Sequence, residues 1–223
     1  MSYATVLKCR KCGQEYPIQP VNLCDSCLSP LEVTYDYEVM AKNVNRKSIA
    51  RGPYSMWRYR DLLPITGEPI DIGSGFTPLV KATNLGRELG MDELYIKNDC
   101  VNPTYSFKDR PVSAAVTKAR EFGFEAIACA STGNLAASVA GHAAKANMKA
   151  YVFIPSDTEK GKLVGAAIYD PVLMVVEGHY DDVNRLCTTL SQRYNWGFIN
   201  INLRPYYAEG SKTLSYEVAE QLG

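Results

Sequence analysis

The second half of the chain alternates short apolar runs with longer stretches of helical length. The apolar runs lie at residues 126–130, 150–154, 172–176 and 198–199, and the helix-length stretches between them lie at 134–146, 157–168 and 179–194. Strands that are apolar along their whole length are typical of a parallel sheet whose two faces are both covered by helices. The alternation therefore predicts an α/β fold with a buried parallel sheet, in which ligands bind at the carboxyl ends of the strands.

Two Cys-x2-Cys pairs near the N-terminus predict a metal site. The pairs are Cys9 with Cys12 and Cys24 with Cys27, and eleven residues separate them. Four thiolates from two tight turns can close a tetrahedral zinc site, with Zn–S distances of about 2.3 Å. Iron in a rubredoxin-like site is an alternative. A disulfide framework is disfavoured because no secretion signal precedes the pairs, and a redox dithiol would not need a second pair.

These patterns divide the chain into three parts. We expect a zinc ribbon over residues 1–35, with a structural role because four thiolates leave no open position on the metal. Residues 36–75 combine prolines with scattered aromatic residues, which indicates an irregular arm. Residues 76–223 form the predicted α/β region, in which a helix expected over 82–89 and a strand expected at 93–97 come first.

Charge and hydropathy exclude two classes of partner. The sequence has 24 basic and 24 acidic residues, so no global field favours nucleic acid or an anionic membrane. The N-terminus lacks the pattern of a signal peptide, and no apolar run approaches the roughly 20 residues of a membrane helix. We expect a cytoplasmic protein that acts on a small molecule. The alternative is a non-catalytic module whose ribbon contacts nucleic acid or protein, which Lys8, Arg10 and Lys11 support.

Lys108 has an unusual position for a lysine. It belongs to the segment Asn102-Pro103-Thr104-Tyr105-Ser106-Phe107-Lys108-Asp109-Arg110. The Asn-Pro turn precedes a helix expected over residues 106–122, so Lys108 falls in the first helical turn. A cation at the positive end of a helix dipole is disfavoured by about 0.3–1 kcal/mol, and Schiff-base chemistry needs a neutral amine. The ordinary alternative is that Lys108 is exposed and pairs with Asp109 or another neighbour. For Asp109 and Arg110 themselves, we expect either a local ion pair that positions the lysine helix or two solvated charges.

A second motif, Ser131-Thr132-Gly133-Asn134, follows the apolar run 126–130 and begins the next predicted helix. Backbone N–H groups converge where such a strand meets its helix, so the loop is suited to bind an anion. Taken alone, the loop is equally well explained as a helix N-cap with a glycine turn. Its place one helix and one strand after Lys108 favours a site that both motifs share. His142, inside the following alanine-rich helix, is expected to be a packing or capping residue.

The two motifs resemble those of a known family. Ser-Phe-Lys-Asp-Arg at 106–110 and Ser-Thr-Gly-Asn at 131–134 are similar to the cofactor-lysine and asparagine-loop motifs of the fold-type II pyridoxal-phosphate (PLP) enzymes, and most closely to those of the threonine synthase family. The segments 75–79 and 205–213 extend the resemblance over nearly the whole chain. The resemblance implies a tryptophan synthase β-like α/β fold with parallel sheets behind a small zinc ribbon. It also implies PLP as cofactor and a homodimer.

The resemblance assigns a role to each motif residue. Lys108 would hold PLP covalently and then act as acid and base in turn. Asn134 would hydrogen-bond the ring hydroxyl of the cofactor, and Phe107 would pack near the cofactor ring. The carboxylate of an amino-acid substrate would be held by the residues that precede Asn134, which are Ser131, Thr132 and Gly133.

The implied reaction converts O-phosphohomoserine and water to threonine and phosphate. Tyr207 stands where the resemblance leads us to expect an arginine for the substrate phosphate, so Arg204 or Lys212 is the expected replacement. Tyr105 and Pro111 also depart from the pattern, since glycine is expected at both positions. Related alternatives keep the same residues and change the leaving group, as in threonine or serine dehydratases and cysteate synthase-like β-replacement enzymes. The ribbon favours a synthase.

The resemblance also bears on length. Threonine synthases are much longer than 223 residues. The glycine-rich loop that holds the PLP phosphate and the residue that faces the pyridine nitrogen are not found in this sequence. We therefore expect the chain to be the N-terminal half of a longer protein.

Overall fold

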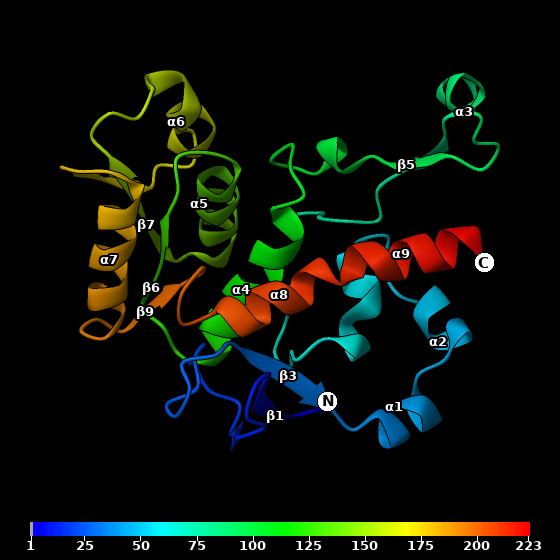
Figure 1. Ribbon diagram of the computed structural model, residues 1–223, viewed down its shortest axis with the longest axis horizontal. Helices are drawn as coiled ribbons and strands as arrows, with labels where there is room; N and C mark the ends of the chain where they lie inside the picture. The colour runs from blue at the N-terminus through cyan, green and yellow to red at the C-terminus, as the bar shows by residue number, and fades with distance from the viewer. Residues whose placement is uncertain (1) are drawn as a thin grey trace.

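The computed structural model describes residues 2–223, apart from the side chains at positions 160 and 162. Its centre is a four-stranded parallel sheet with the strand order β8-β7-β6-β9 (Figure 1). The strands are β6 (Ala126–Ala130), β7 (Lys149–Pro155), β8 (Val172–Val176) and β9 (Trp196–Phe198). The helices around and beyond this sheet are α4 (Asp109–Glu121), α5 (Asn134–Ala146), α6 (Lys160–Ala167), α7 (Tyr180–Ser191), α8 (Arg204–Ser211) and α9 (Thr213–Leu222). The predicted α/β fold with a parallel sheet is confirmed. The expectation that every strand is buried is wrong for the edge strand β8, where Val172, Met174 and Val175 are exposed.

Both faces of strand β6 are buried, as a central strand of a doubly covered sheet requires. Ile127 and Cys129 point into the core that contains α4 and α5 residues, whereas Ala128 and Ala130 pack with the α7 residue Val183 on the other side. The alternation follows from the two-residue period of a strand. In Figure 1, α5 and α7 accordingly lie on opposite sides of the sheet.

The order of the strands places a topological switch point at the carboxyl end of β6. From β6 the chain passes through α5 to β7 and through α6 to β8, and then returns through α7 to β9 on the other edge of β6. The connections on the two sides of β6 therefore run in opposite directions. Ligands of open α/β sheets bind in the crevice at such a point. The loop that begins at Ser131 starts there.

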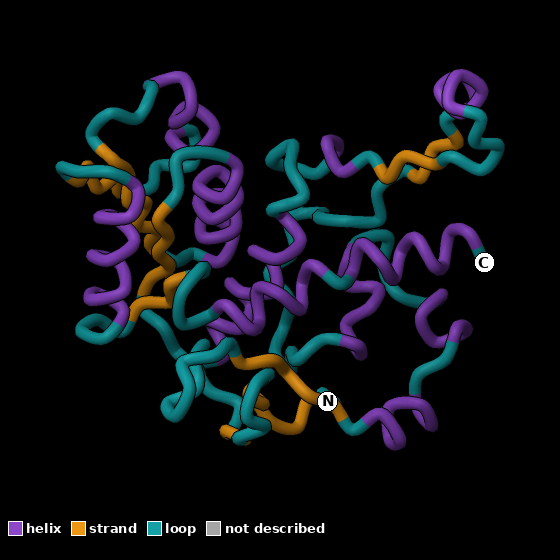
Figure 2. The backbone as a smooth tube through the Cα atoms, viewed as in Figure 1, coloured by secondary structure: helices purple, strands orange, loops and turns teal. Residues whose placement is uncertain are grey.

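The two remaining sheets are antiparallel and lie outside the parallel one (Figure 2). The strands β1 (Ala4–Cys9), β2 (Glu15–Tyr16) and β3 (Leu31–Tyr35) form the first, in the order β2-β1-β3. The second pairs β4 (Leu79–Lys81) with β5 (Tyr95–Lys97). The strand expected at 93–97 is thus present, but it joins a two-stranded ribbon whose residues Val80 and Ile96 are half exposed.

The segment between the first sheet and β4 contains only short helices. They are α1 (Tyr37–Asn43), α2 (Arg46–Ala50) and the 3-10 helix η1 (Met56–Leu62). Two more short helices, α3 (Thr83–Leu89) and the 3-10 helix η2 (Asp99–Val101), lie between β4 and α4. The side chains of Met56, Trp57 and Leu63 are buried, so this part of the chain contributes a core cluster of its own beside Ala114 of α4. Among residues 2–223, no helix has the length and apolar character that crossing a membrane requires.

Helix α8 approaches the start of α4 very closely at Gly210. A Cβ atom at Gly210 would lie 2.6 Å from the carbonyl oxygen of Arg110 and 2.8 Å from the Cα of Pro111. Real Cβ atoms do not come that close to backbone atoms, so a glycine is required for this packing. Gly210 thereby fixes how α8 lies against the N-terminal turn of α4.

A buried cluster of charges joins three distant segments around Arg110. Its guanidinium lies 2.5 Å from a Glu217 oxygen in α9 and 2.7 Å from an Asp99 oxygen in η2. Glu217 also lies 2.7 Å from the Lys97 amine and accepts the backbone N–H of Phe76 at 2.6 Å. The side chains of Arg110 and Glu217 are fully buried. Every charge in the cluster therefore has an opposite charge in contact, as burial requires.

We predict that Glu217→Gln lowers the free energy of unfolding by about 3 kcal/mol, because it leaves buried cations with one carboxylate fewer. Urea denaturation at neutral pH measures this. The control is Glu88→Gln, on an exposed position of α3, which should change stability by less than about 0.5 kcal/mol. Equal stability of the two variants would contradict the role given to the buried cluster.

Candidate active site

Lys108 lies immediately before α4, at the N-cap position, and its side chain is half-buried. The helix thus begins about three residues later than the sequence predicted, after a turn in which the Lys108 N–H donates to the Ser106 hydroxyl at 3.1 Å. The Lys108 amine lies 5.9 Å from the centroid of the Phe107 ring and 5.9 Å from that of Tyr207. Over residues 2–223, no carboxylate lies within ion-pair distance of it. The alternative of an exposed, ion-paired lysine is therefore wrong.

The carboxylate of Asp109 is fully buried and holds the lysine segment in place. It accepts the backbone N–H of Thr104 at 2.7 Å, the Thr104 hydroxyl at 2.5 Å and the Ser138 hydroxyl at 2.7 Å. Asp109 neither pairs with Arg110 nor is solvated, contrary to both sequence expectations. Because Ser138 belongs to α5, this contact joins the lysine segment to the helix that carries the second motif.

A series of buried hydrogen bonds continues from Ser138 to His142. The Nδ1 atom of His142 lies 2.8 Å from the Ser138 carbonyl oxygen, and its Nε2 atom lies 3.3 Å from the Ser74 hydroxyl. Burial lowers the pKa of His142 below its ordinary value, so the neutral ring is favoured. His142 is a packing residue that links α5 to the segment before β4.

The second motif begins where β6 ends. The Ser131 N–H still donates to the Phe153 carbonyl oxygen of β7 at 3.1 Å, and the Gly133 N–H donates to the Ser131 hydroxyl at 3.3 Å. Gly133 is the N-cap of α5, and no side chain caps this helix. The first N–H groups of α5 are consequently available to an anion. Asn134, the first residue of α5, is exposed.

Asp109 connects the lysine segment to the helix that follows the second motif. Ser138, which binds Asp109, lies one helical turn after Asn134, so both side chains are on the same face of α5. Lys108 is the chain neighbour of Asp109. The hydrogen bond between Ser138 and Asp109 therefore ties the residue that follows Lys108 to the helix that begins with Asn134. That Lys108 and the loop 131–134 share one site stays a prediction.

A crevice lies beside Thr132 at the carboxyl ends of the parallel strands. Its volume is about 310 Å³. Its walls come from the loops after β6, β7 and β8, and they consist of Thr132, Pro155, Asp157, Thr158, Glu159, His179 and Tyr180. The position is the one at which open α/β sheets bind ligands. Of the predicted site residues, Thr132 is the one that lines this crevice.

The two candidate phosphate-binding cations have different surroundings. The Lys212 amine lies 2.6 Å from a Glu209 oxygen and 5.6 Å from the centroid of the Tyr35 ring, which turns it toward the N-terminal sheet. Arg204 is the first residue of α8 and is exposed, and no described carboxylate pairs with it. Tyr207, which stands where the resemblance led us to expect a phosphate-binding arginine, is an α8 residue whose ring centroid lies 5.9 Å from the Lys108 amine.

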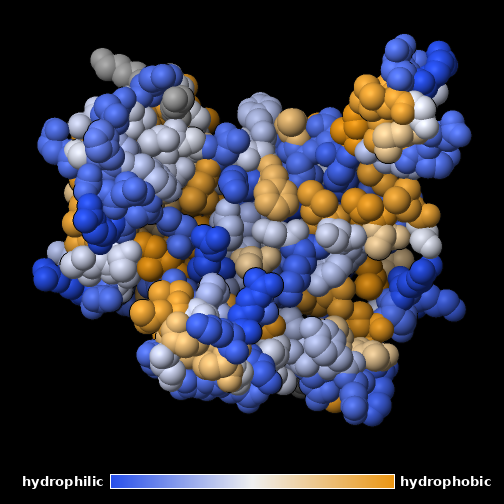
Figure 3. Space-filling view, viewed as in Figure 1, coloured by the Kyte–Doolittle hydropathy of each residue, from blue (hydrophilic) through white to orange (hydrophobic). Residues whose placement is uncertain are grey.

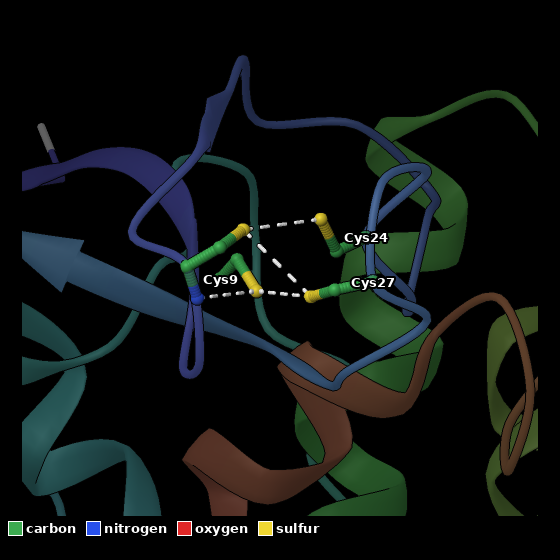
Figure 4. A group of neighbouring side chains, drawn as sticks. Cys9, Cys24 and Cys27 are labelled. Carbon is green, nitrogen blue, oxygen red and sulfur yellow. Dashed lines mark hydrogen bonds between the residues drawn. The ribbon is translucent and has the colours of Figure 1, made fainter.

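The four N-terminal cysteines converge on one point (Figure 4). The Sγ atoms lie 3.4 Å apart for Cys9 and Cys27, 3.6 Å for Cys12 and Cys24, and 3.7 Å for Cys12 and Cys27. A zinc–sulfur distance near 2.3 Å gives a sulfur–sulfur edge of about 3.8 Å in a regular tetrahedron. The arrangement fits a tetrahedral metal site, and all four cysteines are free, so the disulfide framework is not formed.

The ribbon also supplies a group that favours thiolate. The Tyr16 hydroxyl donates to the Cys24 sulfur at 3.3 Å. This hydrogen bond is the largest cause that lowers the pKa of the Cys24 thiol to about 6. The neighbouring cysteines Cys9 and Cys24 act in the opposite direction on Cys12 and raise the pKa of its thiol to about 12.

Comparison with known proteins gives the family. The chain belongs to the pyridoxal-phosphate-dependent enzymes, since a family profile described as "Pyridoxal-phosphate dependent enzyme" matches residues 70–223. A threonine synthase from Methanocaldococcus jannaschii is 36% identical over 218 residues, covering 96% of this chain and 54% of the relative. One from Methanosarcina acetivorans is 38% identical, covering 97% and 53%. The chain thus spans about half the length of the curated relatives it matches.

Solved structures of the same fold are also similar. Escherichia coli diaminopropionate ammonia lyase in its apo form has a TM-score of 0.61 at 18% identity, over 68% of this chain and 49% of that chain. The processed form of threonine deaminase isoform 2 from Solanum lycopersicum has a TM-score of 0.59 at 24% identity, over 65% and 42%. These likenesses confirm the fold-type II architecture that the motifs implied.

We predict that Asp109→Ala destabilises the lysine segment, because three hydrogen bonds to a buried carboxylate are lost. The expected loss in unfolding free energy is about 2–4 kcal/mol. Amide hydrogen exchange should show faster exchange at Thr104, whose N–H would lack its acceptor. Asp92→Ala, at an exposed turn, is the matched control. Unchanged protection of Thr104 in Asp109→Ala would contradict the assignment.

Proposed function

We propose that the chain is the PLP-binding part of a threonine synthase, which converts O-phospho-L-homoserine and water to L-threonine and phosphate. The observation that carries the proposal is the Lys108 amine, half-buried at the start of α4 and tied through Asp109 to the helix of the asparagine loop. The names of the curated relatives support the choice of reaction.

Each motif residue has a role in this proposal. When bound, PLP supplies an electron sink for negative charge that develops on the substrate carbon. Lys108 would hold the cofactor, and its amine would act as the acid and base that moves protons on the substrate. Asn134 would hydrogen-bond the ring hydroxyl, and Phe107 would pack beside the ring. The loop 131–133 binds the substrate carboxylate through its hydroxyls and the uncapped N–H groups of α5.

The substrate phosphate requires a cation. Arg204 and Lys212 are the proposed candidates, and their surroundings differ. The Glu209 carboxylate at 2.6 Å would compete with a phosphate for Lys212. Arg204 has no such competitor among the residues that the structure describes, and its guanidinium suits bidentate phosphate binding. Arg204 is therefore the first position to substitute.

The cysteine cluster is proposed as a structural zinc site. The sulfur–sulfur distances support this. The ribbon packs on α8, where the Tyr206 hydroxyl donates to the Gln19 carbonyl oxygen at 2.8 Å. The zinc would consequently stabilise a module that contacts the same helix as the lysine segment. The family resemblance further supports a homodimer in the cytoplasm.

A non-catalytic ribbon that binds nucleic acid is the second candidate. Its support is Lys8, Arg10 and Lys11. Two of the three, Lys8 and Arg10, each lie 3.2 Å from a carboxylate, on Glu15 and Glu32 respectively. Neutralised cations contribute little to phosphate binding. This observation favours the enzyme.

The proposal predicts a visible absorbance band when PLP is added to the purified chain, because a lysine-linked cofactor absorbs differently from the free aldehyde. Lys108→Ala should lack the band. The control is Lys42→Ala, on an exposed position of α1, which should keep it. A band of equal strength in Lys108→Ala would rule out Lys108 as the cofactor lysine.

Product analysis then separates the related reactions. O-phosphohomoserine, O-phosphoserine with sulfite, and threonine are offered in turn. Threonine and phosphate formed from O-phosphohomoserine support the synthase. Turnover of threonine alone would replace it with a dehydratase, and a sulfonate product from O-phosphoserine would replace it with a β-replacement enzyme.

We predict one zinc ion per chain by elemental analysis, and a loss of that zinc in Cys24→Ser, because one of four thiolates is removed. Cys187→Ser, at a buried position in α7, is the control and should retain the metal. Chelation should lower the thermal stability of the wild-type chain and leave that of Cys24→Ser unchanged. Iron in place of zinc would identify a rubredoxin-like site.

A further inference from the structure

The packing of α8 determines which of its side chains reaches the lysine. Because Gly210 has no side chain, α8 lies in direct contact with the backbone of Arg110 and Pro111 at the start of α4. Tyr207 precedes Gly210 by three residues, so the two share one face of the helix. Lys108 precedes Arg110 by two residues on the facing segment. The close approach that Gly210 permits therefore places the Tyr207 ring next to the Lys108 amine.

The Lys108 amine has two aromatic neighbours and no described carboxylate partner. Its distances to the Phe107 and Tyr207 ring centroids are both 5.9 Å, within the range over which an ammonium is attracted to a ring face. Phe107 is the chain neighbour of Lys108, so its proximity requires no tertiary packing. Tyr207 comes from 99 residues farther along the chain and is held there by α8. Both Lys108 and Tyr207 are half-buried, so water screens the contact only in part.

We propose that Tyr207 is a positioning residue for Lys108, whose ring holds the lysine amine at the start of α4 before any cofactor or substrate is bound. The ring, rather than the hydroxyl, carries the effect, since no described residue hydrogen-bonds the Tyr207 hydroxyl. Removing the ring frees the amine to sample more conformations and exposes it to solvent. The proposal concerns the chain without PLP, and it stands or falls independently of the proposed reaction.

Competitive labelling of the PLP-free chain tests this. The purified protein is treated with a trace of acetic anhydride at constant pH, and acetylation of Lys108 is quantified by mass spectrometry relative to that of exposed Lys42. Tyr207→Leu removes the ring and Tyr207→Phe keeps it. Loss of one cation–π contact should increase the labelling ratio about two- to fivefold in Tyr207→Leu. Tyr207→Phe should match the wild type.

Two controls keep the result interpretable. Tyr37→Leu removes an exposed ring at the start of α1 and should leave the ratio unchanged. Far-ultraviolet circular dichroism must show that Tyr207→Leu is folded; if it is not, the smaller change Tyr207→Met is used in its place. Equal ratios in the wild type and the folded ring-less variant overturn the proposal. A ratio that rises equally in Tyr207→Phe would assign the effect to the hydroxyl and overturn it as well.

Discussion

Arg110 is the residue on which the geometry of the lysine segment depends. Its buried guanidinium contacts Asp99 and Glu217, which reach it from η2 before α4 and from α9 at the end of the chain. Burial alone would raise the pKa of Glu217, but hydrogen bonds from Arg110 and Lys97 hold it below its ordinary value. The carboxylate is therefore charged at neutral pH. Because Arg110 follows Lys108 by two residues, the cluster that anchors its side chain also fixes the start of α4.

Helix α8 connects the N-terminal ribbon to this same region. Its Glu209 accepts a hydrogen bond from the Tyr35 hydroxyl at 2.6 Å, and burial together with that carboxylate raises the pKa of Tyr35. On a different face, Gly210 lies against α4, and Tyr207 faces Lys108. One short helix thus contacts the ribbon, the lysine helix and the lysine itself. The N-terminal sheet is far from Lys108 in sequence and is connected to it through the packing of α8.

The region that carries the motifs is rigid because buried polar groups there are paired. Asp109 accepts three hydrogen bonds, and Ser138 and His142 extend the chain of contacts to Ser74. Such networks specify a single arrangement when every member is satisfied. In contrast, the uncapped start of α5 and the crevice beside Thr132 present polar groups to solvent at the switch point of the sheet. The rigid part positions the lysine, and the open part is accessible to ligand.

The sequence by itself determined the parallel strands, the helices between them and the cysteine cluster. The hydrophobic period and the turn residues are local, so β6, β8 and α5 begin and end where they were predicted. Tertiary structure decided the rest. The partners of Asp109 and Arg110, the antiparallel pairing of β5, and the contact of Tyr207 with Lys108 join residues that are distant in the sequence. No local pattern encodes these contacts, because they arise from how closely two helices pack and from the need to pair buried charges.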